Sequence, residues 1–223
     1  TFDINKFIEK IDEKTSLVSL VNPSMPIGNV YNQNDIIRVL EKAKSVGAMV
    51  IIDEAYHYFY EKGSIGLISK YDNLVVLRTF SKFLSIPGLR MGVVISNPQN
   101  IQYVKNYKPH YTVNGVALAF GETIVDNFDR LYTDLQKTFK DGKQCLITAL
   151  DETGYSYVPT EGCFICIRPK YKTAEYITDE LKKRNILIFC GKGDSAGFLR
   201  VTIWDKKYMK IFMKTLLEID VRG

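Results

Sequence analysis

Short apolar runs alternate with segments of helical spacing through the first half of the sequence, and this order most limits the possible folds. Strand-like apolar runs lie at 17–21, 48–52, 73–77 and 91–95. Between the first two runs, apolar residues from Ile36 to Ala43 recur at the spacing of one helix face, and Gly47 follows where a C-cap is expected. Strands that alternate with helices favour an α/β fold with a mostly parallel sheet.

The second half of the sequence predicts a smaller α/β domain. In the first half, helices are expected over 2–13, 34–46 and 98–107. In the second half, helices are expected over 174–185 and 205–220, and strands over 163–168, 186–189 and 198–203. A long helix is expected from about Gly115 to Leu150, with a kink near Asn127. We place the domain boundary near residue 130, which divides the chain into domains 1–130 and 131–223.

Composition limits the class of protein. The 223 residues are 46% hydrophobic, which is ordinary for a globular core, and the formal net charge is +5. No apolar run approaches the roughly 20 residues that span a bilayer, and no signal peptide opens the chain, so a soluble cytoplasmic protein is expected. The lysines are scattered and form no long basic run, so neither a nucleic acid nor a membrane is predicted as a partner.

The four cysteines and two histidines show no metal-binding pattern. Cys163 and Cys166 lie three residues apart in a predicted strand, so their side chains point to opposite faces and do not share a metal. We therefore expect the cysteines to be buried, reduced thiols, which agrees with a cytoplasmic location. His57 and His110 have no partner at metal-ligand spacing, and no metal site is predicted.

A polar loop follows the third apolar run and carries the first candidate functional residues. Residues 79–92 read Thr-Phe-Ser-Lys-Phe-Leu-Ser-Ile-Pro-Gly-Leu-Arg-Met-Gly. Open α/β sheets bind ligands in loops at the carboxyl ends of their strands. An amine held there partly out of water can attack a carbonyl to form a Schiff base, while hydroxyls and an arginine suit a phosphate. Taken alone, however, the stretch fits a solvated loop lysine better.

Two more polar stretches follow apolar runs. Residues 53–56 (Asp-Glu-Ala-Tyr) place Asp53 at the carboxyl end of one strand, and residues 22–28 form a turn-rich loop after another. A carboxylate buried at a strand end needs a cationic partner. The pyridinium nitrogen of pyridoxal phosphate is such a partner, because a carboxylate keeps that nitrogen protonated and the ring then withdraws electrons from the substrate.

Together these stretches resemble the fold-type I pyridoxal-phosphate (PLP) enzymes, specifically the class I/II aminotransferases related to histidinol-phosphate aminotransferase. That family carries an Asn-Pro loop, an Asp-Glu-Ala-Tyr strand end, a Thr/Ser-x-Ser-Lys motif and a Gly-Leu-Arg-x-Gly turn, matched here in order by 22–28, 53–56, 79–82 and 88–92. Residues 198–203 resemble a fifth motif, a strand that carries an arginine. The resemblance implies an aspartate aminotransferase-like fold, with a partial large domain before a small C-terminal domain. The chain is thus expected to be the C-terminal portion of such an enzyme.

The resemblance also implies a role for each motif residue. Lys82 would form the covalent Schiff-base link to pyridoxal 5'-phosphate and move a proton during catalysis. Asp53 would pair with the pyridine nitrogen, and Tyr56 would hydrogen-bond the phenolic oxygen. The residues implied for the cofactor phosphate are Thr79, Ser81 and Arg90, and those implied for the substrate are Arg200, which would bind its carboxylate, and Asn114.

Each of these residues has a structural alternative. Asp53 could cap a helix, and Tyr56 could be a half-buried packing ring. Arg90 could form a surface ion pair, and Asn114 could be a structural loop residue. Met25 departs from the family, which usually has an asparagine there that reaches the cofactor, because a thioether is only a weak acceptor and cannot donate.

The function implied by the resemblance is that of an aminotransferase. Such an enzyme moves an amino group between an amino acid, or an amino-acid-like phosphate, and a 2-oxo acid in two half-reactions. Relatives work as homodimers, so a homodimer is expected. Two alternatives stay open: a PLP-dependent decarboxylase or lyase of the threonine-phosphate decarboxylase type, which shares every motif above, and a chain that is non-catalytic or inactive as a fragment.

Overall fold

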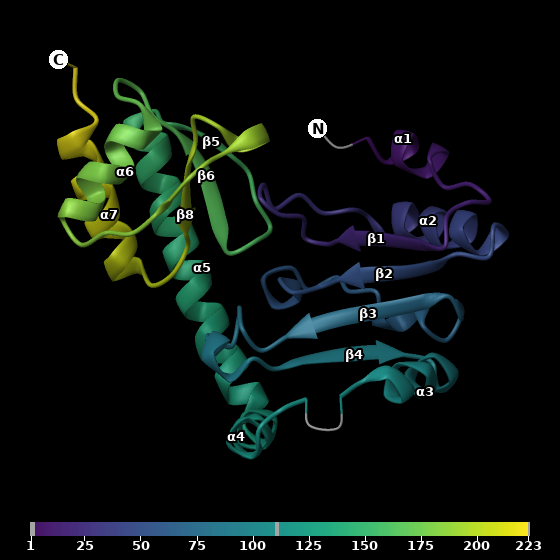
Figure 1. Ribbon diagram of the computed structural model, residues 1–223. Coiled ribbons are helices and arrows are strands. Elements are labelled where there is room, and N and C mark those ends of the chain that lie inside the picture. The colour runs from purple at the N-terminus through teal and green to yellow at the C-terminus, as the bar shows by residue number, and fades with distance from the viewer. Residues whose placement is uncertain (1–2, 110–111, 223) are drawn as a thin grey trace. The chain divides into compact units, whose positions relative to one another are not determined.

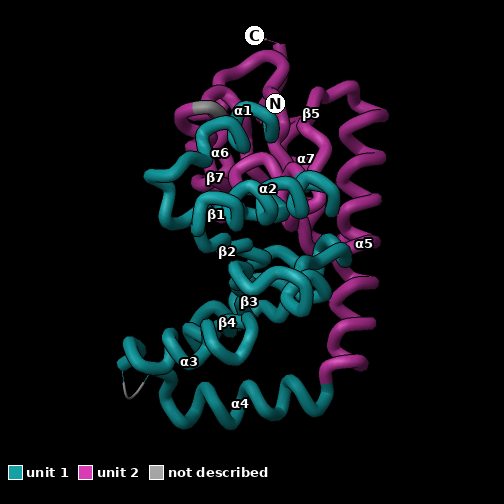
Figure 2. The backbone as a smooth tube through the Cα atoms, turned by 90° about the vertical axis from the view of Figure 1, so that its right-hand side faces the viewer, with its two compact units in different colours: residues 1–24, 30–127 teal, residues 25–29, 128–223 magenta. Residues whose placement is uncertain are grey.

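The computed structural model in Figure 1 describes residues 3–109 and 112–222. The chain forms two compact units, which Figure 2 colours separately. Unit 1 comprises residues 1–24 and 30–127, and unit 2 comprises residues 25–29 and 128–223. Part of the predicted Asn-Pro loop, from Met25 to Asn29, therefore belongs to unit 2, although unit 1 precedes and follows it in the chain.

A four-stranded sheet forms the centre of unit 1. Its strands lie in the order β1-β2-β3-β4, with bounds Leu17–Val21, Met49–Asp53, Leu74–Thr79 and Gly92–Ser96 (Figure 1). β1, β2 and β3 are parallel, as the sequence predicts. β4 instead runs antiparallel to β3, because the connection folds back on itself and the N–H of Phe80 donates to the carbonyl of Met91 at 3.2 Å.

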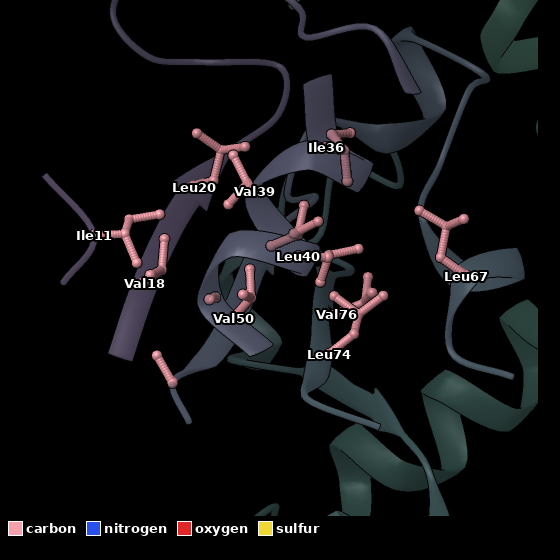
Figure 3. Close-up of a cluster of buried hydrophobic side chains, with 13 residues drawn as sticks. Ile11, Val18, Leu20, Ile36, Val39, Leu40, Val50, Leu67, Leu74 and Val76 are labelled. Carbon is pink, nitrogen blue, oxygen red and sulfur yellow. The ribbon is translucent and has the colours of Figure 1, made fainter. Parts of the chain in front are cut away.

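One face of this sheet packs against α2 (Gln33–Ser45), as Figure 3 shows. Alternate residues of each strand share a face, so each strand presents two apolar side chains to the helix. The buried side chains in this layer are Ile36, Val39, Leu40 and Ala43 of α2, Val18 and Leu20 of β1, Val50 and Ile52 of β2, and Leu74 and Val76 of β3. This core fixes the register of the three parallel strands, and therefore the relative heights at which they end.

Three more helices of unit 1 begin at side chains that cap them. They are α1 (Ile4–Glu9), α3 (Pro98–Tyr107) and α4 (Gly115–Asp126). The side-chain oxygens of Asp3, Asn97 and Asn114 each accept a backbone N–H from the first turn, a contact that typically stabilises a helix by about 1 kcal/mol. Short 3₁₀ helices lie in the loops: η1 (His57–Phe59), η2 (Ile65–Leu67) and η3 (Pro87–Leu89).

Unit 2 contains an antiparallel sheet of short strands in the order β5-β6-β8-β7. The strands span Ser156–Val158, Phe164–Arg168, Leu199–Thr202 and Phe189–Cys190 in that order. The helices of this unit are α5 (Phe128–Thr153), α6 (Ala174–Lys183) and α7 (Lys206–Ile219), and η4 (Gly193–Ser195) precedes β8. α7 contacts both α5 and α6, and its buried residues recur at helical spacing.

A buried carboxylate fastens the end of α7 to the rest of unit 2. Asp220 is 3% exposed and follows the helix directly. Its Oδ2 accepts the hydroxyl of Tyr155 at 2.9 Å and the N–H of Lys170 at 2.7 Å, and its Oδ1 accepts the N–H groups of Tyr171 at 2.9 Å and Lys172 at 2.8 Å. One side chain thus joins the segment after α5, the turn before α6 and the end of α7.

Gly142 allows α5 to approach the segment before α7, and this contact gives a testable prediction. A Cβ at Gly142 would lie 1.5 Å from the backbone oxygen of Trp204, whereas a Cβ at Gly115 would have no heavy atom within 4 Å. We expect Gly142→Ala to lower the free energy of unfolding of unit 2 by about 1–3 kcal/mol through overpacking. Trp204 is the single tryptophan, so its fluorescence during urea denaturation measures the change. Unaltered stability would contradict the close approach, and Gly115→Ala serves as the open-position control.

Several predicted helix boundaries are wrong. α1 ends at Glu9 rather than at residue 13, because the chain then enters a turn in which Thr15 donates its hydroxyl to Asp12 at 3.2 Å. Phe2, the predicted start of this helix, lies outside the described residues. The long helix predicted from Gly115 does break at Asn127, near the expected kink, which divides it into α4 and α5, but α5 ends at Thr153 rather than at Leu150.

Three predictions for unit 2 also need correction. Residues 186–188 are not strand, and β5 was not predicted. Only Cys166 of the four free cysteines is buried, and the other three are half-buried.

Among the described residues, no three His, Cys, Asp or Glu side chains gather where they could hold a metal ion. Within 3–109 and 112–222, no helix combines the length and apolar character that a membrane span requires.

Candidate active site

The predicted cofactor-binding residues of unit 1 lie at the ends of parallel strands or in the loops that follow them. Val21 is opposite Asp53 in the register, and Asp53 is opposite Leu77, so β1, β2 and β3 end at one edge of the sheet. Asn22 follows β1 directly. Its N–H donates to the carbonyl of Asp53 at 2.9 Å, and its side-chain oxygen accepts the N–H of Tyr31 at 3.0 Å. The loops that follow these strands therefore begin side by side.

Asp53 and Glu54 are neighbours in sequence but belong to opposite faces of the sheet. Alternation along the strands puts Asp53 on the same face as Thr79, and Glu54 on the face that packs against α2. Asp53 is half-buried, and its Oδ1 accepts the N–H of Ala55 at 2.9 Å. The expectation that Asp53 is the buried carboxylate of this strand end is therefore wrong. That carboxylate is Glu54, and its cationic partner is Arg78.

The loop over residues 80–91 carries Lys82 and is closed at its base. The hydroxyl of Thr79 donates to the carbonyl of Met91 at 3.1 Å and accepts the N–H of Ser81 at the same distance. Thr79 thus links the end of β3 both to the start of this loop and to its return. The structure thus connects the two residues predicted to supply phosphate-binding hydroxyls, Thr79 directly before the loop and Ser81 within it, through a bond from the Ser81 backbone.

Arg90 ends the same loop in an unusual backbone conformation. Its φ of 54° lies in the left-handed region, which is sparsely populated by residues other than glycine. The side chain is exposed, and Nη1 donates to the carbonyl of Pro87 at 3.0 Å. Strained residues of this kind cluster at ligand sites, where the surrounding structure imposes the conformation. Binding of the cofactor phosphate by Thr79, Ser81 and Arg90 stays a prediction.

Lys82 meets the loop that follows β2. Its Nζ lies 5.7 Å from the centroid of the Tyr56 ring, and Tyr56 is 7% exposed. The next residue, Phe83, is 2% exposed, and its ring lies 5.4 Å from that of Tyr58 and 5.3 Å from that of Phe59. Lys82 itself is exposed in the described chain, so the expectation that it is partly out of water is wrong here. Its backbone is nevertheless anchored by a buried neighbour.

The two predicted substrate residues lie in different units. In unit 2, the guanidinium of Arg200 lies between two aromatic rings, 5.2 Å from the centroid of Phe164 and 4.7 Å from that of Phe189. The planar group is thereby oriented in advance, which suits bidentate recognition of an anion. In unit 1, the Asn114 side chain accepts the N–H of Ala117 at 2.9 Å as the cap of α4. The predicted contacts of Arg200 and Asn114 with substrate are not tested by these observations.

The sequence interpretation missed a buried cluster on the opposite face of the strand ends. Glu54 Oε2 accepts Nε of Arg78 at 3.0 Å and Nη2 at 2.8 Å, while Oε1 accepts the N–H of Ser64 at 2.5 Å. His57 Nδ1 lies 3.7 Å from Glu54 Oε2 and, among the described residues, has no hydrogen-bond partner. Alternation along β3 puts Arg78 on the buried face of the strand. This pattern could have identified the cluster from the sequence, because a buried guanidinium requires an acidic partner.

The environment of His57 predicts a pH effect on stability. Burial lowers its pKa, as does the nearby Arg78 guanidinium, while Glu54 and Glu61 oppose this shift. Below pH 6.5 the His57 side chain binds a proton more readily in the unfolded chain than in the folded one. The stability of the folded chain that depends on neutral His57 is therefore complete above pH 6.5 and is lost as the pH falls toward the lowered pKa. Urea midpoints at pH 7.5 and 5.5 should therefore differ more for the native sequence than for His57→Gln. Equal differences would contradict the prediction.

The chemistry of the donor set fits pyridoxal phosphate. The strand ends and the loop after β3 supply a carboxylate for the ring nitrogen, an amine for the aldehyde carbon, and hydroxyls with a guanidinium for the phosphate. These are the groups of Asp53, Lys82, Thr79, Ser81 and Arg90. Tyr56 adds a phenol beside Lys82, available to a polar substituent of the ring.

Comparison with known proteins supports this interpretation. The family model for aminotransferase class I and II matches residues 1–216. A histidinol-phosphate aminotransferase from Caldanaerobacter subterraneus subsp. tengcongensis is 30% identical over 223 residues, which cover 98% of this chain and 62% of the relative. The chain thus spans about three fifths of the length of the curated relatives it matches.

Solved structures agree on the fold. The histidinol-phosphate aminotransferase from Clostridium acetobutylicum superposes with a TM-score of 0.85 at 26% identity, covering 98% of this chain and 68% of that one. The L-threonine-O-3-phosphate decarboxylase from Porphyromonas gingivalis has a TM-score of 0.80 at 22% identity, covering 97% and 68%, a likeness of fold alone. With the family match over nearly its whole length, the chain belongs to the class I and II aminotransferases and has their aspartate aminotransferase-like fold.

Proposed function

We propose that the protein that carries this chain is a PLP-dependent aminotransferase. It moves an amino group between an amino acid, or a phosphate-bearing amino compound, and a 2-oxo acid. The observation that carries this proposal is the approach of Lys82 Nζ to the Tyr56 ring at 5.7 Å, which unites two separate family motifs at one edge of the sheet. In this proposal unit 1 is part of the cofactor-binding large domain, and unit 2 is the small domain.

Each group of the chain has a defined task in this proposal. Bound pyridoxal phosphate supplies an electrophilic carbon and a ring that withdraws electrons from the substrate. Asp53 holds a proton on the ring nitrogen, and Tyr56 donates a hydrogen bond to the phenolic oxygen. Arg90 pairs with the phosphate and orients it, assisted by hydroxyls at the start of the loop. Lys82 would anchor the cofactor, and its amine would carry the proton that leaves the substrate α-carbon.

The substrate, the assembly and the location are proposed more broadly. Arg200 binds an anionic group of the substrate, because its guanidinium is already oriented between two rings. Asn114 is the second proposed substrate contact. Histidinol phosphate, named in the relatives, is therefore the first amino donor to examine. We also propose a homodimer, and a cytoplasmic location supported by four free thiols.

Product analysis tests this function. The complete protein that carries this chain would be supplied with pyridoxal phosphate, histidinol phosphate or a panel of amino acids, and 2-oxo acid acceptors. We expect the donor to become a carbonyl compound and the acceptor to become its amino acid, without release of carbon dioxide. Carbon dioxide release without amino transfer would instead assign a decarboxylase. If the cofactor-loaded protein yields neither carbon dioxide nor a product of amino transfer, the chain is non-catalytic.

A further inference from the structure

The buried cluster around Glu54 lies directly behind the proposed cofactor site. The Glu54 side chain is 1% exposed, and its two oxygens accept from Ser64 and Arg78. The Arg78 side chain is 15% exposed and directs both Nε and Nη2 to the same oxygen. A pair withdrawn from water to this degree gains little net stability, because desolvation offsets most of the Coulomb attraction. Stability alone therefore does not explain the pair.

The position of the pair in the sheet suggests its role. Glu54 directly follows Asp53, and Arg78 directly precedes Thr79. Because neighbouring residues of a strand point to opposite faces, the ion pair spans β2 and β3 on one face while Asp53 and Thr79 occupy the other. The N–H of Glu54 also donates to the carbonyl of Leu77 at 2.8 Å, so the ladder extends to this point. The pair therefore holds together the two strand ends that carry site residues.

A second connection leads from the pair to Lys82. The guanidinium of Arg78 lies 5.8 Å from the centroid of the Tyr58 ring, and the Tyr58 ring lies 5.4 Å from that of Phe83. Phe83 is buried, whereas Lys82, which directly precedes it in the chain, is exposed. The N–H of His57 donates to the backbone carbonyl of Glu54 at 2.9 Å, which fixes the start of η1. Displacement of Arg78 would thus reach Lys82 through two packed rings.

We propose that the Glu54–Arg78 ion pair positions the cofactor site: it fixes Asp53 relative to Thr79 across the strand ends and, through Tyr58 and Phe83, the backbone of Lys82. Glu54 and Arg78 are positioning residues and do not themselves touch cofactor or substrate. The inference rests on the proposed function, since it concerns pyridoxal phosphate at Lys82. Misplacement of reacting groups by about 1 Å can cost on the order of 100-fold in rate. Loss of an ion pair that holds these groups in place therefore has a measurable effect on the site.

The decisive variant removes the pair without leaving a lone buried charge. In Glu54→Leu/Arg78→Met both partners become apolar, a change that often leaves stability unaltered, whereas removal of one partner is strongly destabilising. Urea denaturation of the cofactor-free protein measures folding. The dissociation constant for pyridoxal phosphate comes from absorption. The site of attachment comes from borohydride reduction followed by peptide mass spectrometry.

We expect the folded double variant to bind pyridoxal phosphate at least about tenfold more weakly than the native sequence, with less of the label on Lys82 and more on other lysines. The control is Lys44→Met/Asp72→Leu, which removes an exposed ion pair of 2.8 Å from the same unit. Its affinity and labelling should match the native sequence. Native affinity and native labelling in the Glu54/Arg78 double variant would overturn the inference.

Gly63→Ala provides a second variant in case the double variant does not fold. A Cβ at Gly63 would lie 2.7 Å from Nη2 of Arg78 and 2.8 Å from Cε1 of His57, so it displaces the guanidinium without removing a charge. We expect weaker binding and less selective labelling of Lys82 here too, and native behaviour would contradict the inference. Absence of Lys82 labelling in the native sequence would instead refute the proposed function itself, so the two failures are distinguishable.

Discussion

Lys82→Ala is expected to reduce amino transfer by about 10²–10⁴-fold or more, because it removes the group that carries the substrate proton and the covalent anchor of the cofactor. Lys82 is the family-motif lysine whose Nζ lies beside the Tyr56 ring. Initial rates of product formation at saturating pyridoxal phosphate measure the loss. Excess cofactor does not restore the rate, since the missing function is chemical and does not depend on occupancy of the site.

The matched control for this variant is Lys70→Ala. Lys70 is an exposed lysine of the same unit and lies beyond η2, away from the family motifs. Its replacement should leave the rate within about twofold of the native value, because isolated surface substitutions rarely perturb a fold. A native rate in Lys82→Ala, or an equal loss in both variants, would remove Lys82 from the mechanism.

Asp220→Ala is expected to have the largest effect on stability. The substitution leaves the Tyr155 hydroxyl and three backbone N–H groups without their acceptor. Each orphaned buried donor costs about 1–3 kcal/mol unless water reaches it, so we expect a total loss of about 3–5 kcal/mol in the free energy of unfolding of unit 2. Trp204 fluorescence during urea denaturation reports this loss, because the only tryptophan belongs to that unit.

A similar pair at the surface provides the control. The hydroxyl of Tyr157 donates to Asp151 at 3.1 Å in an exposed position, so Asp151→Ala should cost less than about 1 kcal/mol. A loss for Asp220→Ala as small as this would contradict the account of the buried carboxylate.

Asp220 also predicts acid sensitivity. Although burial opposes ionisation, bonds from the Lys170, Lys172 and Tyr171 N–H groups and from Tyr155 hold the pKa of Asp220 below its ordinary value. Its stabilisation is therefore complete above the unfolded pKa near 3.8 and is lost as the pH falls through the lowered one. In Asp220→Ala this part of the acid dependence should disappear, and an unchanged pH dependence of the urea midpoint would contradict it.

The sequence predicted the elements whose signals are local. β1 was predicted with the bounds of Leu17–Val21, and α3 begins at Pro98 as expected, because proline is favoured in the first turn of a helix. The direction of β4 was not predictable, since an apolar run is the same read in either direction, and only the folded-back connection decides the pairing. β5 was missed because three residues are too few to show a period.

The sequence predicts the kinds of residue in the candidate site but not how far each side chain is buried. Motif resemblance predicted Asp53 and Lys82 as site residues, but it did not show that Lys82 is exposed or that Glu54 is the buried acid. The second point was accessible to physical reasoning. Val50 and Ile52 occupy the buried positions of β2, so the next residue on their face is Glu54, not Asp53. The same alternation identifies Arg78 as its partner.

The most direct test of the central claim is an absorption titration with pyridoxal phosphate, carried out on the protein that carries this chain and in parallel on Lys82→Ala. We predict a band near the edge of the visible range that saturates with cofactor, requires Lys82 and shifts when an amino donor is added. A band of equal strength in both proteins, or no band in either, would contradict the assignment of Lys82 as the residue that binds the cofactor.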